Sequence, residues 1–462
     1  MSATLGGGGI SAGGGGSKPI FTQNTAWVDS TNGNNTTAVV GRQDLPFATI
    51  AVALAAASTG QTVYIRPGTY NVTTSILKNG VNVFAYGAVI NMTGVALQDG
   101  QLADNGNAIT CKVYGGTYTR TESVDSGDGI HARIVGMTNA SSNIQIWAEK
   151  IMFTSTMPAT GNYCVWQEAG NLRVECPYMN ANATTSTSVG VAWLNGSGFI
   201  RAQQILANGV AVYSQVDNAP TGDFYVEADL IDTATLGGKS GGDFTIWQNG
   251  SNASAAIWVR ASVIKCSTQA NARSVVTTAS MANKLYVSAQ KLFGLARLDG
   301  SGLTYIDTDK WEPTLNGGLS NSMFVTASAG TSFVNCRHYD PVAFTGAAIR
   351  TTTGGTADLR IGYGFFTGGA SSAIGLRCDG GTLRANSMRV DTSANSGTQP
   401  AANNGGVLVL TNCTLVANAG ADSISASTAQ NVVAMSSWAN KAVNLNVTIV
   451  PTLGLGVDSG VI

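Results

Sequence analysis

The chain has 462 residues and a formal net charge of −1; charged residues make up 11% of it and apolar residues 44%. The apolar fraction excludes an intrinsically disordered chain, and the lack of any basic run argues against binding to nucleic acid. The longest apolar stretch, residues 48–57, is about half as long as a membrane span, so membrane insertion is not expected either.

Residues 1–20 are rich in glycine and contain two runs of four glycines. Such a segment is expected to form a flexible tether. We predict that it anchors the protein to other proteins of a larger assembly; the alternative is a disordered leader. The segment lacks the charged start and the apolar core of a signal peptide, so assembly in a reducing cytoplasm is the expectation.

Residues 21–92 contain one segment with helical periodicity. Its apolar positions fall on a single helical face: Phe47, Ile50, Leu54 and Ala57. Pro46 stands near the expected start of this helix, and Gly60 follows its end. We predict a short helix here that covers the N-terminal end of the strands that follow, because an uncovered sheet edge invites aggregation.

Residues 93–430 repeat a short pattern about every 26 residues: an apolar residue, a small residue two positions later, and then a large apolar one. The small position falls at Ala148, Cys176, Ala202, Ala228, Ala261, Ala289, Thr308, Cys336, Tyr363 and Ala385. Between the matches lie turn-forming Gly, Asn, Ser and Thr, without helical periodicity. The sequence therefore predicts an all-β solenoid, a parallel β-helix in which each coil pairs with the next.

The segment 27–90 carries a recognisable motif. Its parts are Asp29 and Gly33, "PFATI" at 46–50, "VYIRPGTY" at 63–70 and "GAVI" at 87–90. It resembles the first coils of the pectate-lyase-like superfamily of right-handed parallel β-helices, and it is similar in style to fibre and spike virion proteins of tailed bacteriophages. The resemblance implies a right-handed parallel β-helix with a short N-terminal capping α-helix, and a homotrimer anchored by its N-terminus. It implies no particular activity, because one fold supports many.

Seven cysteines are spread widely along the chain without a CxxC pair. Disulfide frameworks and zinc sites need paired or closer spacing. We therefore expect these cysteines to be small buried apolar side chains, and we predict no metal site and no cofactor.

The densest group of ionisable residues is "ESVDSGDGIHAR", residues 122–133. Asp128 and His131 are its candidate catalytic residues, because general acid–base chemistry needs two such groups converging on one bond. Metal binding and a solvated turn are the alternatives. If Ala132 turns inward on the strand that follows, His131 and Arg133 face outward.

A second acidic pair is Asp307 and Asp309. The two residues lie two apart on a predicted strand, so they share a face at roughly 6.5–7 Å by strand rise. That separation is compatible with the two carboxyl groups of an inverting glycosidase. The alternative is an outward polar surface, with Ile306 and Thr308 turned inward.

One column of the repeat is aromatic on six successive coils. Its members are Phe199, Tyr225, Trp258, Tyr286, Tyr305 and Phe333. Each shares a face with the residue two positions later, and polar residues such as Arg201 and Asp307 there place the column on the outer surface. Large exposed apolar patches mark interaction surfaces. The alternatives are burial against a sister chain of a trimer or beneath a loop, stacking of a host glycan, and an error in the alternation that would turn the rings inward.

Residues 431–462 are apolar and nearly uncharged, and we expect them to form the last coil or a trimer contact. Together with the resemblance, the sequence predicts a structural bacteriophage virion protein, a tail fibre, tailspike or head fibre that faces host-surface glycans. It would be assembled in the cytoplasm of the host bacterium. The main alternative is a polysaccharide lyase or glycoside hydrolase on the same scaffold, acting as a capsule depolymerase. A bacterial adhesin is disfavoured by the missing secretion signal.

Overall fold

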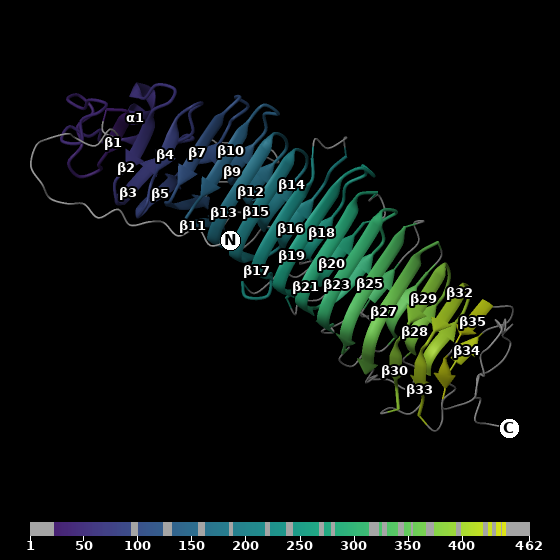
Figure 1. Ribbon diagram of the computed structural model, residues 1–462. Helices are drawn as coiled ribbons and strands as arrows, with labels where there is room; N and C mark the ends of the chain where they lie inside the picture. Colours follow the sequence, from purple (N-terminus) through teal and green to yellow (C-terminus); the bar gives the residue numbers. More distant parts are fainter. Residues whose placement is uncertain are drawn as a thin grey trace, which may run out of the picture.

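The protein is a parallel β-helix, in which strands from successive coils stack along one axis into an elongated body (Figure 1). The predicted all-β solenoid is confirmed. The structure is a computed structural model that describes residues 23–439 except for the internal segments 94–99, 123–131, 156–161, 184–187, 218–221, 237–243, 268–271, 279–281, 314–322, 326–329, 341–345, 353, 366–373, 394–398, 419–423, 427–430 and 436. Residues 1–20, for which a tether was predicted, lie outside the described part. Of residues 431–462, for which the last coil or a trimer contact was predicted, the described ones up to 439 pair with the preceding coil, and 440–462 lie outside the described part.

Two sheets contain the strands of the described residues, one with 23 strands and one with 13. The larger sheet takes one or two strands from each coil: β1 (Thr25–Val28), β2 (Thr62–Ile65), β3 (Gly68–Val72), β4 (Asn82–Phe84), β5 (Ala88–Thr93), β7 (Thr110–Tyr114), β8 (Thr117–Glu122), β10 (Asn143–Trp147), β11 (Lys150–Ser155), β13 (Asn171–Ala183), β15 (Ser197–Ala207), β17 (Phe224–Asp232), β19 (Ala256–Lys265), β21 (Lys284–Phe293), β23 (Leu303–Glu312), β25 (Thr331–Tyr339), β27 (Thr356–Phe365), β29 (Thr382–Asn386), β30 (Arg389–Asp391), β32 (Val407–Thr411), β33 (Thr414–Val416), β35 (Asn431–Met435) and β36 (Trp438–Ala439).

The smaller sheet takes one strand from each coil: β6 (Leu102–Ala103), β9 (Ala132–Met137), β12 (Asn162–Gln167), β14 (Ser188–Trp193), β16 (Val210–Ser214), β18 (Phe244–Gln248), β20 (Arg273–Thr277), β22 (Leu295–Leu298), β24 (Met323–Val325), β26 (Ala347–Thr351), β28 (Ile374–Cys378), β31 (Gln399–Asn403) and β34 (Ile424–Ala426). All pairings between these strands are parallel, as expected when each coil returns to the same side of the stack.

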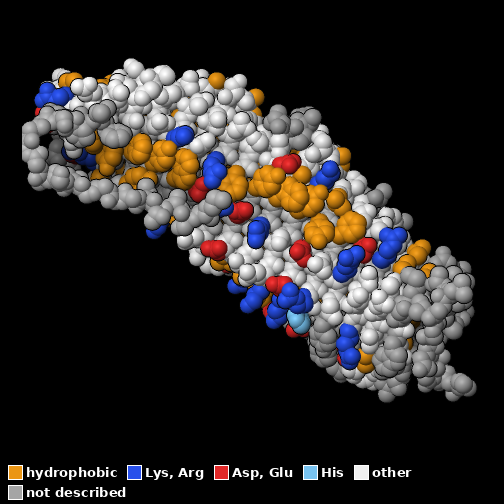
Figure 2. All heavy atoms as spheres, viewed as in Figure 1, with side chains coloured by type: hydrophobic (Ala, Val, Ile, Leu, Met, Phe, Trp, Pro, Cys, Tyr) orange, Lys and Arg blue, Asp and Glu red, His pale blue; other side chains and the backbone are white. Residues whose placement is uncertain are grey.

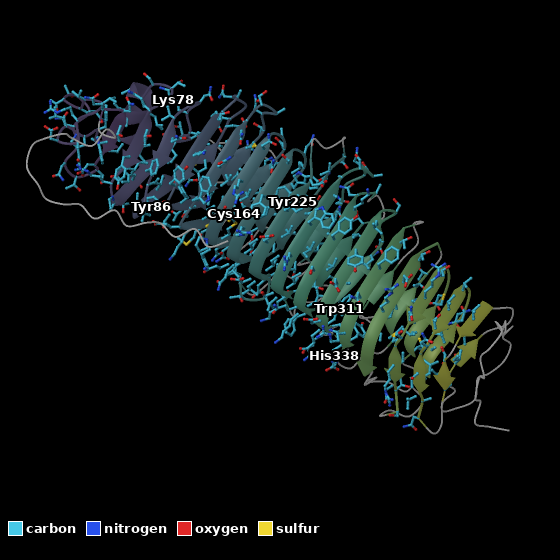
Figure 3. All side chains as sticks on the ribbon, viewed as in Figure 1. Lys78, Tyr86, Cys164, Tyr225, Trp311 and His338 are labelled. Carbon is cyan, nitrogen blue, oxygen red and sulfur yellow. The ribbon has the colours of Figure 1, made fainter. Side chains whose placement is uncertain are left out.

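The N-terminal end of the stack is covered by α1 (Ile50–Ala56), as the helical periodicity predicted. Its inward face is formed by buried apolar residues: Phe47, Ile50, Ala53, Leu54 and Ala57. Lys78 lies beside this helix (Figure 3) and donates hydrogen bonds from Nζ to the carbonyl oxygens of Leu54 at 2.8 Å and Ala57 at 2.7 Å. A cation at this position satisfies carbonyl groups that a helix end leaves without partners.

The turn that precedes α1 explains two residues of the N-terminal motif. Asp29 accepts hydrogen bonds from the backbone N–H groups of Thr31 at 2.9 Å and Asn32 at 3.0 Å, and from Nη1 of Arg66 at 2.8 Å. A side chain at Gly33 would place its Cβ 2.2 Å from the carbonyl oxygen of Phe47, so only glycine fits there. The motif therefore fixes the first turn of the coil stack.

The pairing between coils follows the repeat that the sequence predicted for most of its length. Cys176 pairs with Ala202, and Ala228 pairs with Ala261. The assignments of Tyr363 and Ala385 to the small position are wrong by two residues, because Cys336 pairs with Ile361 and Leu359 pairs with Ala385. A slip of two residues preserves the inward and outward alternation, so the pattern could not reveal it.

Apolar side chains fill the interior of the coils, and all seven cysteines are buried and free, as predicted. Burial raises the pKa of the Cys111, Cys176 and Cys336 thiols to about 12, so these groups stay protonated and unreactive at neutral pH. Among the described residues no group of three or more His, Cys, Asp or Glu is placed to hold a metal ion. No helix in the same residues is long and apolar enough to cross a membrane.

Candidate functional site

A groove of about 790 Å³ runs along the outer face of the larger sheet. Tyr86 and Gly115 line its N-terminal end. From Trp147 on β10 to Asp309 on β23 it crosses six successive strand pairings, which corresponds to about 29 Å at the usual spacing of strands. Small side chains form its floor: Ala148, Cys176, Ala202, Ala228, Ala261, Ala289 and Thr308. The small position of the repeat thus has a consequence that the sequence did not reveal, since it leaves an extended hollow on the surface.

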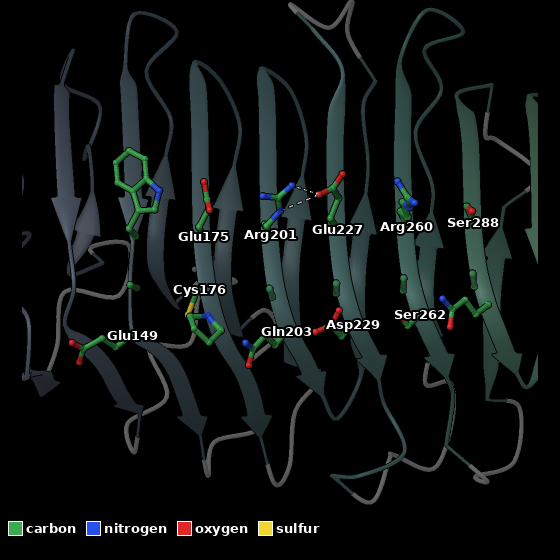
Figure 4. A pocket seen from close by; sticks show the side chains of 18 of the residues that line it. Glu149, Glu175, Cys176, Arg201, Gln203, Glu227, Asp229, Arg260, Ser262 and Ser288 are labelled. Carbon is green, nitrogen blue, oxygen red and sulfur yellow. Dashed lines mark hydrogen bonds and ion pairs between the residues drawn. The ribbon is translucent and has the colours of Figure 1, made fainter. Parts of the chain in front are cut away.

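One wall of the groove is a column of polar residues, one from each coil. Its members, each paired in register with the next, are Glu175, Arg201, Glu227, Arg260, Ser288 and Asp307 (Figure 4). Arg201 donates to Oε2 of Glu227 from Nη2 at 2.7 Å and from Nε at 3.1 Å. Glu175 accepts a hydrogen bond from Nε of Arg173 at 2.8 Å. Acidic and basic side chains therefore alternate along this wall and largely neutralise one another.

Arg260 is the basic residue of this wall that is not engaged in such a pair. Its neighbour Glu227 is paired with Arg201, and its other neighbour is Ser288. Within the described part of the chain, its guanidinium has no hydrogen bond or ion pair. The side chain is exposed and lines the groove. Its guanidinium, a planar group with five N–H donors, can therefore donate hydrogen bonds to a ligand in the groove.

The opposite wall is also polar. It consists of Gln203, Asp229, Ser262, Gln290 and Asp309 (Figure 4). Asp309 forms an ion pair with Arg337 on the next coil at 3.1 Å. The walls thus offer hydrogen-bonding groups on most coils, with Pro177 as the exception on β13 of the opposite wall. Above a floor of small residues, this arrangement suits a long polar ligand in extended form.

The six predicted aromatic residues form an outward column beside the groove, which we call the ladder. Each pairs in register with the next, from Phe199 to Phe333. The exposed fraction is 42% for Tyr225, 38% for Trp258, 39% for Tyr305 and 38% for Phe333. The prediction that the column faces outward is confirmed, and the alternative of an internal aromatic stack is wrong. Figure 2 shows a stripe of hydrophobic side chains along this face.

The rings of the ladder stack closely only in its middle. Tyr225 and Trp258 have ring centroids 6.1 Å apart with 9° between their planes, and Trp258 and Tyr286 are 3.8 Å apart at 5°. A second hollow of about 440 Å³ lies between these rings and the polar wall, lined by Glu227, Arg260 and Asp307 on the polar side. Apolar rings and charged groups therefore face one shared space.

A second aromatic column, which we call the N-terminal ladder, was not predicted. It pairs in register across the first coils and consists of Trp27, Tyr64, Phe84, Tyr114 and Trp147. Tyr114 stacks on Phe84 at 4.6 Å and on Trp147 at 4.9 Å. Each ring follows a buried apolar residue, as in "AWV", "VYI", "VFA" and "IWA", and this recurring triplet is the signal that could have revealed the column.

Asp307 and Asp309 both line the groove, as their spacing on one strand face predicted, while Ile306 and Thr308 are buried. Both carboxylates already have a partner within the protein. Oδ1 of Asp307 accepts a hydrogen bond from Nδ2 of Asn335 at 2.7 Å, and Asp309 is paired with Arg337. The pair therefore lies in the right place to contact a ligand, with at least one oxygen of each carboxylate already bonded.

The candidates Asp128 and His131 lie outside the described residues, so their geometry stays a prediction. Arg133 was expected to face outward. It is only 8% exposed, so it is covered and not open to solvent. The reason is Gly136, which has no side chain: a Cβ there would lie 2.6 Å from Cδ of Arg133. The arginine lies along the sheet over this glycine, and alternation alone does not predict that.

A comparison of the chain with protein-family models, with curated proteins and with solved structures finds no match. The fold is therefore defined by the strand pairing, and the candidate site by the groove and the ladder.

Proposed function

We propose that this β-helix is an attachment protein that binds an extended carbohydrate chain along the groove. The observation that carries the proposal is the exposed ladder beside a polar groove about 29 Å long. Sugar rings combine an apolar face with a rim of hydroxyl groups, so they fit a site that pairs aromatic rings with hydrogen-bonding side chains. The groove offers polar side chains along its length, and the aromatic rings stand beside it from Phe199 onward.

We propose further that the protein belongs to the surface of a bacteriophage virion, as a tail fibre, tailspike or head fibre assembled in the host cytoplasm as a homotrimer. The support is the resemblance of segment 27–90 to phage fibre and spike proteins, and the glycine-rich residues 1–20 that would attach to other virion proteins. Immunogold electron microscopy of purified particles tests this assignment. Label on the tail or capsid supports it, and particles without label contradict it.

Replacing the four exposed rings of the ladder tests carbohydrate binding. When Tyr225, Trp258, Tyr305 and Phe333 are all changed to serine, we expect loss of retention in native gels that contain host-surface polysaccharide, with an unchanged mass by light scattering. A lower oligomeric mass instead would assign the ladder to a contact between sister chains. An unchanged mass with unchanged retention would contradict both roles.

A second candidate function, cleavage of the polysaccharide, is favoured by one observation: Asp307 and Asp309 lie together in the groove. Two carboxyl groups on one strand face are the minimum that glycoside hydrolysis requires. If the protein is a depolymerase, incubation with capsular polysaccharide releases new reducing ends, and Asp307→Asn abolishes the release. Binding without shortening of the polymer assigns the protein to attachment alone.

A further inference from the structure

The ladder is not uniform, and its geometry locates one sugar position within the groove. We infer that a neutral pyranose ring stacks at the step between Tyr305 and Phe333, with Asp307 accepting hydrogen bonds from its hydroxyl groups. The inference rests on the proposed carbohydrate binding and adds to it both a position and a substrate class.

Trp258, in the middle of the ladder, lies between two other rings. Trp258 is covered on one face by Tyr286 at 3.8 Å and on the other by Tyr225, which is nearly parallel to it at 6.1 Å. The exposure of Trp258 is therefore exposure of a ring edge. Since sugars stack on the flat face of an aromatic ring, this part of the ladder supports its neighbours instead of holding a sugar.

The N-terminal end of the ladder is closed by charged side chains. The guanidinium groups of Arg173 and Arg201 lie over the ring of Phe199, at 4.9 Å and 5.2 Å from its centroid. Arg201 is in turn held by Glu227 on the next coil. Cation–π contacts thus already occupy the ring of Phe199.

The C-terminal end of the ladder is open. Tyr305 is tilted by 42° from Tyr286, with 6.5 Å between the ring centroids. Tyr305 and Phe333 pair in register, yet no ring contact between them exists among the described residues. Both are more than a third exposed. This step therefore offers aromatic faces that no other side chain of the ladder covers.

The polar side chains beside this step favour a neutral sugar. Asp307 lies two residues after Tyr305, on the same face of β23, and its Oδ1 is held by Asn335 at 2.7 Å. A carboxylate beside an aromatic ring accepts hydrogen bonds from sugar hydroxyl groups. Asp307 would also repel the carboxylate or sulfate of an acidic sugar, whereas Arg260 would attract one two coils away.

Affinity electrophoresis in native gels tests the position. The gels contain dextran, galactomannan or glucomannan as neutral polymers, and alginate or polygalacturonate as acidic ones. We expect a neutral polymer to retard the wild-type protein, and Tyr305→Ser to weaken that retention about tenfold, the equivalent of roughly 1.4 kcal/mol. The matched control is Tyr225→Ser, because Tyr225 is similarly exposed but has Trp258 on one face. This change should weaken retention by less than about threefold.

The Asp307→Asn variant tests the substrate class. Removing this charge should lower the preference for neutral over acidic polymers, because the repulsion of acidic sugars is lost. Preferential retention by acidic polymers that Arg260→Gln abolishes would overturn the neutral assignment. Equal losses in Tyr305→Ser and Tyr225→Ser would overturn the position while leaving carbohydrate binding intact. Failure of every polymer to retard the wild-type protein would instead overturn the proposed function itself.

Discussion

The first coils and the middle coils of this β-helix place their aromatic rings in different columns of the same sheet. In the first coils the rings run from Trp27 to Trp147, and the residue that pairs with Trp147 on the next coil is Glu175. From there on this column is polar and forms a wall of the groove, while the aromatic column lies two residues earlier, from Phe199 onward. A shift of the aromatic column by two residues thus distinguishes the first coils, where rings occupy the surface, from the middle coils, where the surface is an open groove.

The two aromatic columns also differ in burial. All five rings of the N-terminal ladder are partly buried, whereas four of the six rings of the ladder are exposed. The difference teaches that a stack of aromatic residues in a β-helix does not by itself mark a binding surface. Its position relative to the small residues of the floor decides whether the rings fill the surface or border a hollow.

The largest effect is expected when the groove is filled as in the first coils. Ser288→Trp puts an indole into the polar wall between Arg260 and Asp307. We expect carbohydrate retention to fall about a hundredfold, the equivalent of roughly 2.7 kcal/mol, with little change in thermal stability. Ser141→Trp, in an exposed turn outside the groove lining, is the matched control and should bind normally. Unchanged binding by Ser288→Trp would show that the groove is not the site.

A smaller effect is expected from a change that weakens the N-terminal ladder. Tyr114 lies between two rings, so Tyr114→Ser should lower the free energy of unfolding by about 2 kcal/mol. Tyr225→Ser in the exposed ladder should cost less than about 1 kcal/mol. Urea denaturation followed by circular dichroism measures both. Equal losses would mean that the two columns contribute alike to stability.

The smallest effect is expected at the N-terminal turn, where pH provides the readout. The backbone N–H of Asn32 holds the pKa of Asp29 below its ordinary value, against burial and with the help of Arg66. Because the pKa is depressed in the folded state, the stabilisation is present at neutral pH and is lost as the pH falls below about 4. Asp29→Asn should cost about 1 kcal/mol at pH 7 and remove part of this acid sensitivity.

Thermal unfolding at pH 7 and pH 3 measures the effect of Asp29→Asn. The control is Asp44→Asn, which breaks an exposed ion pair with Arg42 and should change little at either pH. If both variants keep the acid sensitivity of the wild-type protein, the turn at Asp29 is not its source.

The sequence allowed the fold and the register of the ladder to be predicted, because buried apolar residues alternate with exposed ones on every coil. The prediction failed at positions that the alternation of buried and exposed residues does not determine. Tyr363 and Ala385 were misplaced by two residues, since a slip of two residues keeps the same inward and outward alternation. Arg133 was misplaced because a missing side chain at Gly136 lets a long arginine lie flat against the sheet.

The candidate site could be predicted only in part. The six rings and the pair Asp307 and Asp309 were found from their positions in the repeat. The groove was not predicted, for two reasons. Its floor is the space left by small residues such as Ala202 and Ala261, and its walls are built from residue types that share no sequence pattern. Arg260 became notable only once Glu227 was seen to pair with Arg201.

Each coil contributes one residue to each wall of the groove, and this has a consequence for how the protein can change. A substitution such as Ser288 to another polar residue alters one position along the bound chain and leaves its neighbours as they are. Gaining or losing a whole coil would lengthen or shorten the groove by one strand spacing, about 4.8 Å, without disturbing the remaining positions. The length of polymer contacted and the chemistry of each contact can therefore vary independently.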